Sequence, residues 1–415
     1  MKKCVYPSKI DGTIQAPSSK SFMQRAVAAA LLADGMSLIA NPSLCEDSIA
    51  AMSVAEGLGA SIMKNSDMVM IKGGLDLKSD LLDCGESGLC IRMFTPIAAL
   101  TGKRVALTGR GSLTKRPVSR IEESLLSLGV SIKSNDGLLP LEVSSLLKGG
   151  YAEIDGSLSS QFLTGLLMAL PAAAEDSVIK VKNLASRKYI DMTIEVLKHF
   201  GIDIENHEYE EFVIKAGQSY KPGIIEIEGD WSGAAFMLCA GAISGHVIIR
   251  GLNADSSQAD REIIAALKQC GADVNISKDF VEVSKKNLNA FEFNAEDCPD
   301  LIPPLTALAI HCKGETIIKG TDRLKNKESN REEAIKSEFE KLGAIIRIDN
   351  NRMIITGSDI TGGEINPHGD HRIAMACAIA SLSGSGMVAI ENAECVNKSY
   401  NSFYNNLAKL GVKIE

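Results

Sequence analysis

A stretch near the N-terminus combines small, hydroxylated and cationic residues in a pattern suited to binding an anion. Pro17-Ser18-Ser19-Lys20-Ser21 leads into an Ala/Leu-rich run, and Arg25 follows within two turns. We expect a short strand to end here and a helix to begin. A helix start leaves backbone N–H groups unpaired and carries a partial positive charge, so small residues there allow an anion to approach the backbone.

The same layout returns at five further expected helix starts. They are Gly85-Glu86-Ser87-Gly88, Ser159-Ser160-Gln161, Gly229-Asp230-Trp231-Ser232, Cys298-Pro299-Asp300 and Gly369-Asp370-His371-Arg372. Any one of them is most simply an ordinary N-cap, in which a side-chain oxygen accepts a hydrogen bond from the first turn. Their repetition beside the cations Lys20, Arg25, Arg92 and Arg372 favours an anion site built from several helix starts.

Six glycines recur at a nearly constant spacing of 68 to 72 residues. They are Gly59, Gly129, Gly201, Gly271, Gly343 and Gly411. We interpret each as the residue that follows a helix C-terminus, where a left-handed backbone favours glycine. Two short alternating strands follow, around polar turns such as Asn65-Ser66-Asp67, and a β-rich run such as Val105-Ala106-Leu107-Thr108 comes earlier in each unit. The chain is therefore predicted to contain six βαβαββ repeats.

The sixth repeat stops at Glu415, one strand after its glycine. Two N-terminal segments are candidates to complete it, Cys4-Val5-Tyr6 and Gly12-Thr13-Ile14-Gln15. We therefore predict two α/β domains of three repeats each, one formed by residues 1–18 plus 230–415 and the other by residues 19–229. Ligands of α/β folds usually bind at the carboxyl ends of the strands, where the first helices begin. The expectation is an interdomain cleft lined by the six helix starts.

Composition and charge disfavour several classes of partner. A chain of 415 residues exceeds what one hydrophobic core normally serves, and 45% hydrophobic with 23% charged residues is ordinary for a globular protein. A net charge of −8 disfavours nucleic acid or an acidic membrane as the main partner. Ten cysteines without a C-x-x-C pair or zinc-ligand spacing indicate reduced thiols. With no apolar signal region and no membrane-spanning run, we expect a cytoplasmic protein.

Ten stretches, in one order along nearly the whole chain, carry a specific resemblance. They are Ser19-Lys20-Ser21 with Arg25, Gly85-Glu86-Ser87-Gly88 with Arg92, Lys115-Arg116-Pro117, residues 156–163, Ser186 with Tyr189, Glu228-Gly229-Asp230, Pro299-Asp300, Lys327-Glu328 with Arg331, Asp370-His371-Arg372, and Lys398. The chain resembles the 5-enolpyruvylshikimate-3-phosphate synthase family. The resemblance implies two inside-out α/β barrel domains and transfer of the enolpyruvyl group of phosphoenolpyruvate to the 5-hydroxyl of shikimate 3-phosphate. That reaction releases phosphate and belongs to the shikimate pathway of aromatic amino acid biosynthesis.

The resemblance also assigns residues to the two anionic substrates. Shikimate 3-phosphate would contact Lys20, Ser21, Arg25, Ser159, Ser160, Gln161, Ser186, Tyr189, Asp300 and Lys327. Phosphoenolpyruvate would contact Lys20, Gly88, Arg116, Gln161, Arg331, Arg372 and Lys398. Cations and backbone donors suit phosphate and carboxylate groups, and the arginine fork matches both. Taken singly, Arg116 or Lys398 would more simply be a solvated surface charge.

Two carboxylates match the positions that the reaction needs. By resemblance, Asp300 is the base toward the 5-hydroxyl, and Glu328 is the proton donor and acceptor at the methylene carbon, with Lys20 as a third catalytic residue. Carboxylates in different local fields can hold different protonation states at neutral pH. Without the resemblance, Asp300 would be interpreted as a helix cap and Glu328 as an exposed charge.

Some residues differ from the family pattern, and two histidines raise the question of a metal site. Glu86 and Leu89 stand where many members have Asn and Thr. His368 and His371 provide too few ligands to indicate a metal site. We therefore expect no metal and no cofactor. The family implies a monomer.

Two alternatives remain open from the sequence. The first is the related transferase that acts on UDP-N-acetylglucosamine and carries a reactive cysteine on a mobile loop. Residues 102–117, the corresponding span, contain no cysteine. The second alternative is a non-catalytic repeat scaffold, which would have no reason to place Lys, Arg, Asp and Gln at helix starts in both halves.

Overall fold

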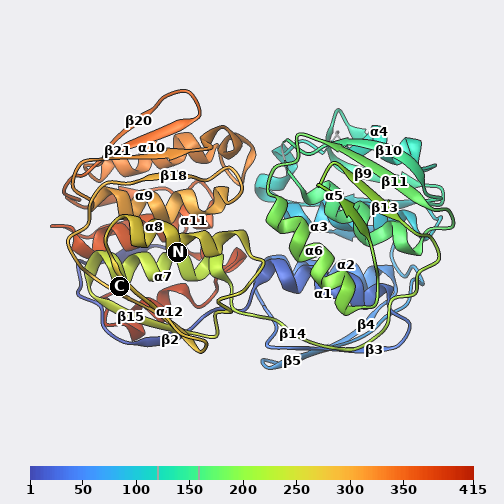
Figure 1. Ribbon diagram of the computed structural model, residues 1–415, viewed down its shortest axis with the longest axis horizontal. Coiled ribbons are helices and arrows are strands. Elements are labelled where there is room, and N and C mark those ends of the chain that lie inside the picture. The colour runs from blue at the N-terminus through green and yellow to red at the C-terminus, as the bar shows by residue number, and fades with distance from the viewer. Residues whose placement is uncertain (119–120, 158) are drawn as a thin grey trace. The chain divides into compact units, whose positions relative to one another are not determined.

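The chain divides into two compact units. The computed structural model describes residues 1–118, 121–157 and 159–415, so Leu158 of one family-like stretch lies outside the described residues. Unit 1 consists of Met1–Pro17 and Glu228–Glu415, and unit 2 consists of Ser18–Ile227. Each unit is built from helices and short strands in repeating order (Figure 1).

Unit 2 begins with the helix that follows Ser19 and ends with a strand before unit 1 resumes. Its elements are α1 (Lys20–Leu32), β3 (Met36–Ala40), α2 (Glu46–Leu58), β4 (Ser61–Lys64), β5 (Met68–Lys72), β6 (Leu81–Asp83), α3 (Gly88–Ala99), β7 (Val105–Thr108), η1 (Gly111–Lys115), α4 (Glu122–Ser127), β8 (Ser131–Asn135), β9 (Leu138–Ser144), β10 (Gly150–Asp155), α5 (Gln161–Ala169), η3 (Leu170–Ala172), β11 (Ser177–Lys182), α6 (Arg187–His199), β12 (Glu205–His207), β13 (Glu211–Ile214) and β14 (Ile224–Glu226). These strands form the sheets β14-β3-β5-β4, β6-β7-β9-β8 and β10-β11-β13-β12.

Unit 1 combines two N-terminal strands with the C-terminal part of the chain. Its elements are β1 (Lys3–Val5), β2 (Thr13–Gln15), α7 (Trp231–Ser244), β15 (His246–Arg250), η4 (Ala259–Glu262), α8 (Ile263–Gln269), β16 (Asp273–Ile276), β17 (Phe280–Ser284), β18 (Glu292–Asn294), η5 (Pro299–Leu301), α9 (Ile302–Ile310), β19 (Glu315–Lys319), η6 (Thr321–Asn326), α10 (Arg331–Lys341), β20 (Ile345–Ile348), β21 (Arg352–Thr356), β22 (Gly363–Ile365), α11 (His371–Ala380), η7 (Ser381–Ser383), β23 (Val388–Ile390), η8 (Ala393–Lys398) and α12 (Phe403–Lys409). The sheets are β16-β17-β15-β2, β18-β19-β21-β20 and β1-β23-β22.

Each four-stranded sheet has the same pairing. In the sheet of β6 to β9, β6 runs parallel to β7, β7 is antiparallel to β9, and β9 is antiparallel to β8. Leu82 is in register with Leu107, and Leu107 with Leu141, and all three are buried. Because strand side chains alternate between faces, one face of each sheet is apolar and covers helices.

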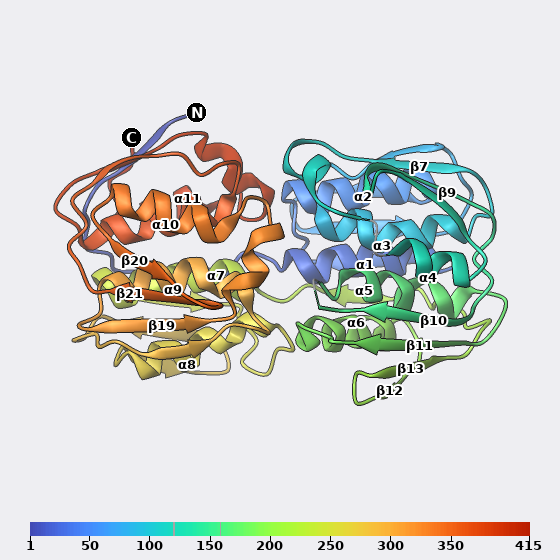
Figure 2. The same ribbon diagram turned by 90° about the horizontal axis from the view of Figure 1, so that it is seen from above.

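The first helix of each repeat is apolar all round and lies in the centre of its unit. Every residue of α3 and of α9 is buried, and in α7 only Ser232 is not. Helices α7, α9 and α11 pack on one another, as α3 packs on α5 (Figure 2). The second helices are amphipathic instead, and α6 buries only Ile190, Met192, Thr193, Val196 and Leu197. A helix apolar on all faces belongs in a core, so these sequences dictate helices inside and sheets outside.

The predicted repeat is confirmed in most details. All six repeat glycines have positive φ, from 78° to 136°. Five stand directly after the C-cap residue, and Gly59 is itself the C-cap of α2. The β-rich run Val105–Thr108 is β7.

Two expectations about the chain ends need correction. β1 does complete the sixth repeat, because it pairs with β23. β2 does not, since it pairs in parallel with β15 of the fourth repeat. β2 directly precedes α1, and β14 directly precedes α7 in the same way. β14 likewise pairs with a strand of another repeat, β3 of the first repeat. The expected strand after Gly411 is reduced to a single bridge between Ile414 and Val5.

No helix within the described ranges is both long enough and apolar enough to cross a lipid bilayer.

We predict that Gly59→Ala destabilises the protein more than Gly201→Ala does. A Cβ on Gly59 would lie 2.4 Å from the backbone of Asp76 and Gly74, whereas a Cβ on Gly201 would meet the flexible side chain of Lys221 at 3.0 Å. Gly201→Ala should cost about 1–2 kcal/mol for a left-handed backbone. Gly59→Ala should cost about 1–3 kcal/mol more, because backbone must move. Urea denaturation measures both, and equal losses would contradict the packing at Gly59.

Candidate active site

In unit 2, serine side chains stand at the starts of the three central helices. Ser19 and Ser87 accept hydrogen bonds from Phe22 N and Cys90 N, which caps α1 and α3. Ser87 Oγ also donates to Gln24 Oε1 at 3.0 Å, so these two helix starts are joined. Ser160 precedes α5 and is buried. The residues at the N-cap positions of these three helices therefore carry neutral hydroxyl groups.

Arg25 is a buried cation whose hydrogen bonds go to neutral oxygens. Its side chain donates to Thr193 Oγ1 at 2.9 Å, to Ser21 O at 2.9 Å, to Tyr189 O at 3.2 Å and to Thr164 Oγ1 at 3.4 Å. Burial lowers the pKa of Arg25 to about 10. The predicted residues Ser21, Arg25 and Tyr189 are thus brought together between α1 and α6, around a positive charge that these oxygens do not neutralise.

Arg92 links three segments that carry predicted residues. Its guanidinium group donates to Gly88 O at 3.1 Å, to Gln161 Oε1 at 3.0 Å and to Pro117 O at 3.0 Å. A Cβ on Gly88 would lie 2.7 Å from Nη1 of Arg116, so the absence of a side chain lets this guanidinium approach the start of α3. Gly88, Arg116 and Gln161 are therefore neighbours, with Arg92 between them.

The remaining predicted residues of unit 2 lie at other helix starts. Lys20 is the first residue of α1, and its Nζ is 3.0 Å from Asp47 Oδ2 on α2. Ser159 Oγ accepts from the backbone N–H of Gln161 at 3.2 Å. Ser186, with φ of 61°, precedes α6 and is buried.

In unit 1, Asp300 lies at the centre of a group of cations. Its Oδ1 is 2.9 Å from Arg331 Nη1 and 3.3 Å from Lys327 Nζ, and its Oδ2 is 3.1 Å from Arg372 Nη2. The elements that meet here are η5, α10 and α11. Asp300 thus directly contacts three of the other five predicted residues of this unit.

Arg331 is fully buried, and three carboxylates surround it. Besides Asp300, its guanidinium group bonds Glu328 and, at 2.8 Å, Asp370 Oδ2. Asp370 is itself the N-cap of α11 and accepts from Arg372 N. Such compensation is needed, because a buried charge without partners costs several kcal/mol.

These contacts move the pKa values of the site residues. Burial alone would raise the pKa of Asp300, but Arg372, Lys327 and Arg331 outweigh burial and hold it well below its usual range. Burial lowers the pKa of Lys327 to about 8, although Asp300 opposes that shift. Asp300 is therefore an ionised carboxylate at neutral pH.

Lys398 completes the predicted set. It ends η8, which packs on α11, and it is 4% exposed. The interpretation of this lysine as a solvated surface charge is therefore wrong, and the same holds for Arg116 at 8%.

The sequence did not reveal the role of three residues whose side chains bond the predicted site residues. Arg92 and Asp370 were noted only at expected helix starts and in matching stretches, and Asp47 was not noted at all. Each has a partner far away in the sequence: Lys20 lies 27 residues from Asp47, Arg331 lies 39 from Asp370, and Gln161 lies 69 from Arg92. For Arg92, one indication of such a role was present in the sequence, because a charged residue within an otherwise apolar helix needs polar partners.

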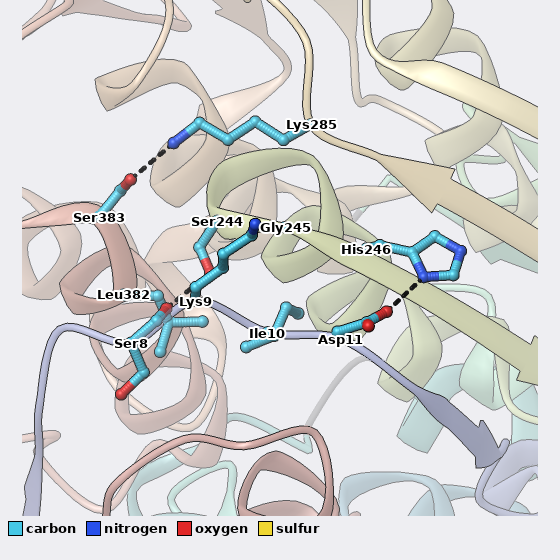
Figure 3. Close-up of a pocket in the computed structure, with 10 residues that line it drawn as sticks. All are labelled: Ser8, Lys9, Ile10, Asp11, Ser244, Gly245, His246, Lys285, Leu382 and Ser383. Atoms are coloured by element: carbon cyan, nitrogen blue, oxygen red, sulfur yellow. Dashed lines mark hydrogen bonds and ion pairs between the residues drawn. The ribbon is translucent and has the colours of Figure 1, made fainter.

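A hollow lies elsewhere in unit 1, and no predicted site residue lines it. It has a volume of about 910 Å³ and is shown in Figure 3. His246 lies between Asp11 at 2.8 Å and Glu282 at 2.9 Å, and Lys285 donates to Ser383 at 2.9 Å. Asp11 and His246, both in its lining, are thus paired with each other. Among the described residues, no group of three or more His, Cys, Asp or Glu side chains is placed to hold a metal ion.

The fold defines a class of enzyme. A solved structure of EPSP synthase from Acinetobacter baumannii is similar to this chain with a TM-score of 0.84 and 25% identity, covering 100% of this chain and 99% of that one. The enolpyruvyl transferase NikO from Streptomyces tendae has a TM-score of 0.81 at 18% identity, covering 100% and 98%, which shows the fold alone. The fold is that of enolpyruvyl transferases.

The sequence comparisons narrow the class to one family. The family model of EPSP synthase (3-phosphoshikimate 1-carboxyvinyltransferase) matches residues 5–407. Relatives named 3-phosphoshikimate 1-carboxyvinyltransferase include one from Clostridium perfringens, 40% identical over 418 residues that cover 99% of both chains. Another, from Clostridium kluyveri, is 38% identical over 415 residues, covering 99% of this chain and 97% of the relative. The chain belongs to the EPSP synthase family.

We predict that Asp370→Ala destabilises the protein by about 3–5 kcal/mol. The change leaves the buried Arg331 with fewer compensating carboxylates and removes the cap of α11. Urea denaturation at pH 7 measures the loss. The matched control is Asp349→Ala, whose partner Arg352 is 42% exposed, and it should cost less than about 1 kcal/mol. Similar losses in both variants would show that the Arg331 network does not depend on Asp370.

Proposed function

We propose that this chain transfers the enolpyruvyl group of phosphoenolpyruvate to the 5-hydroxyl of shikimate 3-phosphate and releases phosphate. It is a transferase of the shikimate pathway, which leads to the aromatic amino acids. The observation that carries the proposal is the family match over residues 5–407, together with the ionised Asp300 among three cations. The family match does not favour a transferase acting on UDP-N-acetylglucosamine or a non-catalytic scaffold.

The charges of both units suit two anionic substrates. In unit 2, the buried Arg25 is surrounded by hydroxyl and carbonyl oxygens, so a phosphate group would supply the missing negative charge. Arg116 beside Gly88 offers a guanidinium fork next to a helix N-terminus, which suits a carboxylate or a phosphate. In unit 1, the family resemblance assigns Lys327, Arg331, Arg372 and Lys398 to the substrates.

Asp300 is proposed as the base that takes the proton of the 5-hydroxyl. Its pKa is well below the usual range while Arg372, Lys327 and Arg331 hold it, which makes it a weak base. Anionic substrates would share these cations, weaken their hold on Asp300 and raise its pKa. Substrate binding itself would thus activate the base.

Glu328 is proposed as the group that moves protons at the methylene carbon. In the addition step, the oxygen of shikimate 3-phosphate bonds to C2 of phosphoenolpyruvate while Glu328 gives a proton to C3. In the elimination step, Glu328 takes a proton back from C3, the double bond re-forms and phosphate leaves. Lys20, whose position at the start of α1 is held by Asp47, would offset the charge on the phosphoenolpyruvate.

Two further proposals follow from the family and the composition. All ten cysteines are free thiols, and eight of them are buried, which suits a reducing compartment such as the cytoplasm. We propose that the protein acts there as a monomer.

The proposed reaction is tested by phosphate release. Release should require phosphoenolpyruvate and shikimate 3-phosphate together, and neither substrate alone should suffice. Release with UDP-N-acetylglucosamine in place of shikimate 3-phosphate would contradict the proposal and support the first alternative.

Arg116→Ala and Asp300→Ala should each reduce kcat/KM by at least about 10²-fold, through loss of a substrate cation and of the base. The matched controls are Arg104→Ala and Asp176→Ala, which remove exposed charges from the pairs with Glu142 and Lys215 and should stay within about twofold. Circular dichroism verifies that each variant is folded. Near-normal turnover in either site variant would count against the role proposed for that residue.

A further inference from the structure

Glu338 is a buried carboxylate that the proposed mechanism does not use. It lies on α10, two turns after Arg331, and its side chain is 1% exposed. Its Oε1 is bonded to His368 Nε2 at 2.8 Å, and its Oε2 accepts from the backbone N–H of Asn366 at 3.0 Å. Lys341 of the same helix donates to both oxygens, at 2.9 Å and 2.7 Å. One side chain therefore joins α10 to the segment between β22 and α11, and the two helices pack on each other (Figure 2).

The ionisation of Glu338 fixes the direction of its bond to the histidine. Burial would raise the pKa of Glu338, but the bonds from Lys341, Asn366 and His368 outweigh burial and lower it. A carboxylate can only accept hydrogen bonds, so His368 Nε2 carries the hydrogen and donates it. The ring of His368 and the backbone of Asn366 are thus two donors that depend on the same acceptor.

These two donors belong to a tight turn between β22 and α11. His368 and Gly369 both have positive φ, of 55° and 72°. A left-handed backbone is unfavourable for a residue with a Cβ, and it persists where the surrounding structure holds it. Within the turn, Asn366 Oδ1 accepts from His368 N at 2.8 Å, and Pro367 O accepts from Asp370 N at 2.8 Å. The buried carboxylate adds the bonds that attach this turn to α10.

The turn leads directly into residues of the candidate active site. Asp370 caps α11 by accepting from Arg372 N at 3.0 Å, and its Oδ2 lies 2.8 Å from Arg331 Nε. Arg372 in turn donates to Asp300 Oδ2 at 3.1 Å. The bond from the histidine ring to the buried carboxylate is made two residues before Asp370, so it holds the start of α11 against α10.

We propose that Glu338 is a positioning residue for Arg372. Through its bonds to His368 and to the backbone of Asn366, it fixes the start of α11 and keeps the Arg372 guanidinium group in place for phosphoenolpyruvate. The effect on phosphoenolpyruvate rests on the proposed function, whereas the anchoring of the turn does not depend on it.

The kinetic test compares His368→Ala with His368→Gln, whose side-chain amide can donate to the same carboxylate. Both variants keep a Cβ on the left-handed backbone, so they differ in the hydrogen bond. In His368→Ala, KM for phosphoenolpyruvate should rise by about 10-fold, because a misplaced cation binds this substrate less tightly. In His368→Gln, it should stay within about twofold of the wild-type value, because the donor is restored.

The second substrate separates positioning from a general loss of structure. The resemblance does not assign Arg372 to shikimate 3-phosphate, so KM for shikimate 3-phosphate should change by less than about twofold in both variants. Equal increases in the two KM values of His368→Ala would contradict a role that acts through Arg372.

Lys341→Ala is the matched control. It removes another donor from the Glu338 carboxylate, and the side chain of Lys341 is 50% exposed, close to the 45% of His368. Its bonds to Glu338 stay within one turn of α10, so KM for phosphoenolpyruvate should remain within about twofold of the wild-type value. An unchanged KM in His368→Ala, or equal changes in His368→Ala and Lys341→Ala, would overturn the inference.

A further measurement needs no substrate. Hydrogen exchange followed by mass spectrometry should show faster exchange over residues 366–373 in His368→Ala than in the wild type or in Lys341→Ala, because the turn has lost its anchor. Unchanged exchange in His368→Ala would also overturn the inference. If exchange is faster in this variant but the wild type releases no phosphate from the two substrates, the proposed function fails while the anchoring of the turn stands.

Discussion

The burial of helices that are apolar on every face is the constraint on which the rest of the structure depends. Such helices can lie only in the centre of a unit, with the sheets around them. Each central helix is entered from the carboxyl end of a strand, so its N-terminus emerges beside those of its two companions. The backbone N–H groups and the partial positive charges of three helices are thereby concentrated at one end of each unit.

The side chains at the N-termini of the central helices differ between the two units. Unit 2 has serine before α1, α3 and α5, whereas unit 1 has Asp230, Asp300 and Asp370 at the equivalent starts. The consequence is visible in the buried arginines. Arg331 is neutralised by carboxylates, but the hydrogen bonds of Arg25 go to neutral oxygens. One unit therefore suits the fixing of a phosphate group, and the other suits the movement of protons between acidic and basic side chains.

Local sequence information predicted the repeats well. A glycine after each helix and the alternation of short strands depend on the conformation of a few adjacent residues, and they were recognisable without the structure. The partner of β2 was not, because a three-residue strand matches several sheets equally and only the tertiary structure selects one. The same limit applies to the contacts of the site. Arg25 meets Thr193, 168 residues away, and nothing in either local sequence indicates the other.

Resemblance to a family supplied what local patterns could not, namely which charges belong together. Asp300 alone is indistinguishable from a helix cap.

The pairing of β1 and β2 with strands near the far end of the chain has a consequence for synthesis. The first seventeen residues leave the ribosome before any of their partners in β15 and β23 exist. At about 5–20 residues per second, β23 is complete roughly 20–75 s after them. Residues 18–227 can assemble during that interval, and β2 can pair once β15 is complete, whereas β1 must remain unpaired until translation is nearly over.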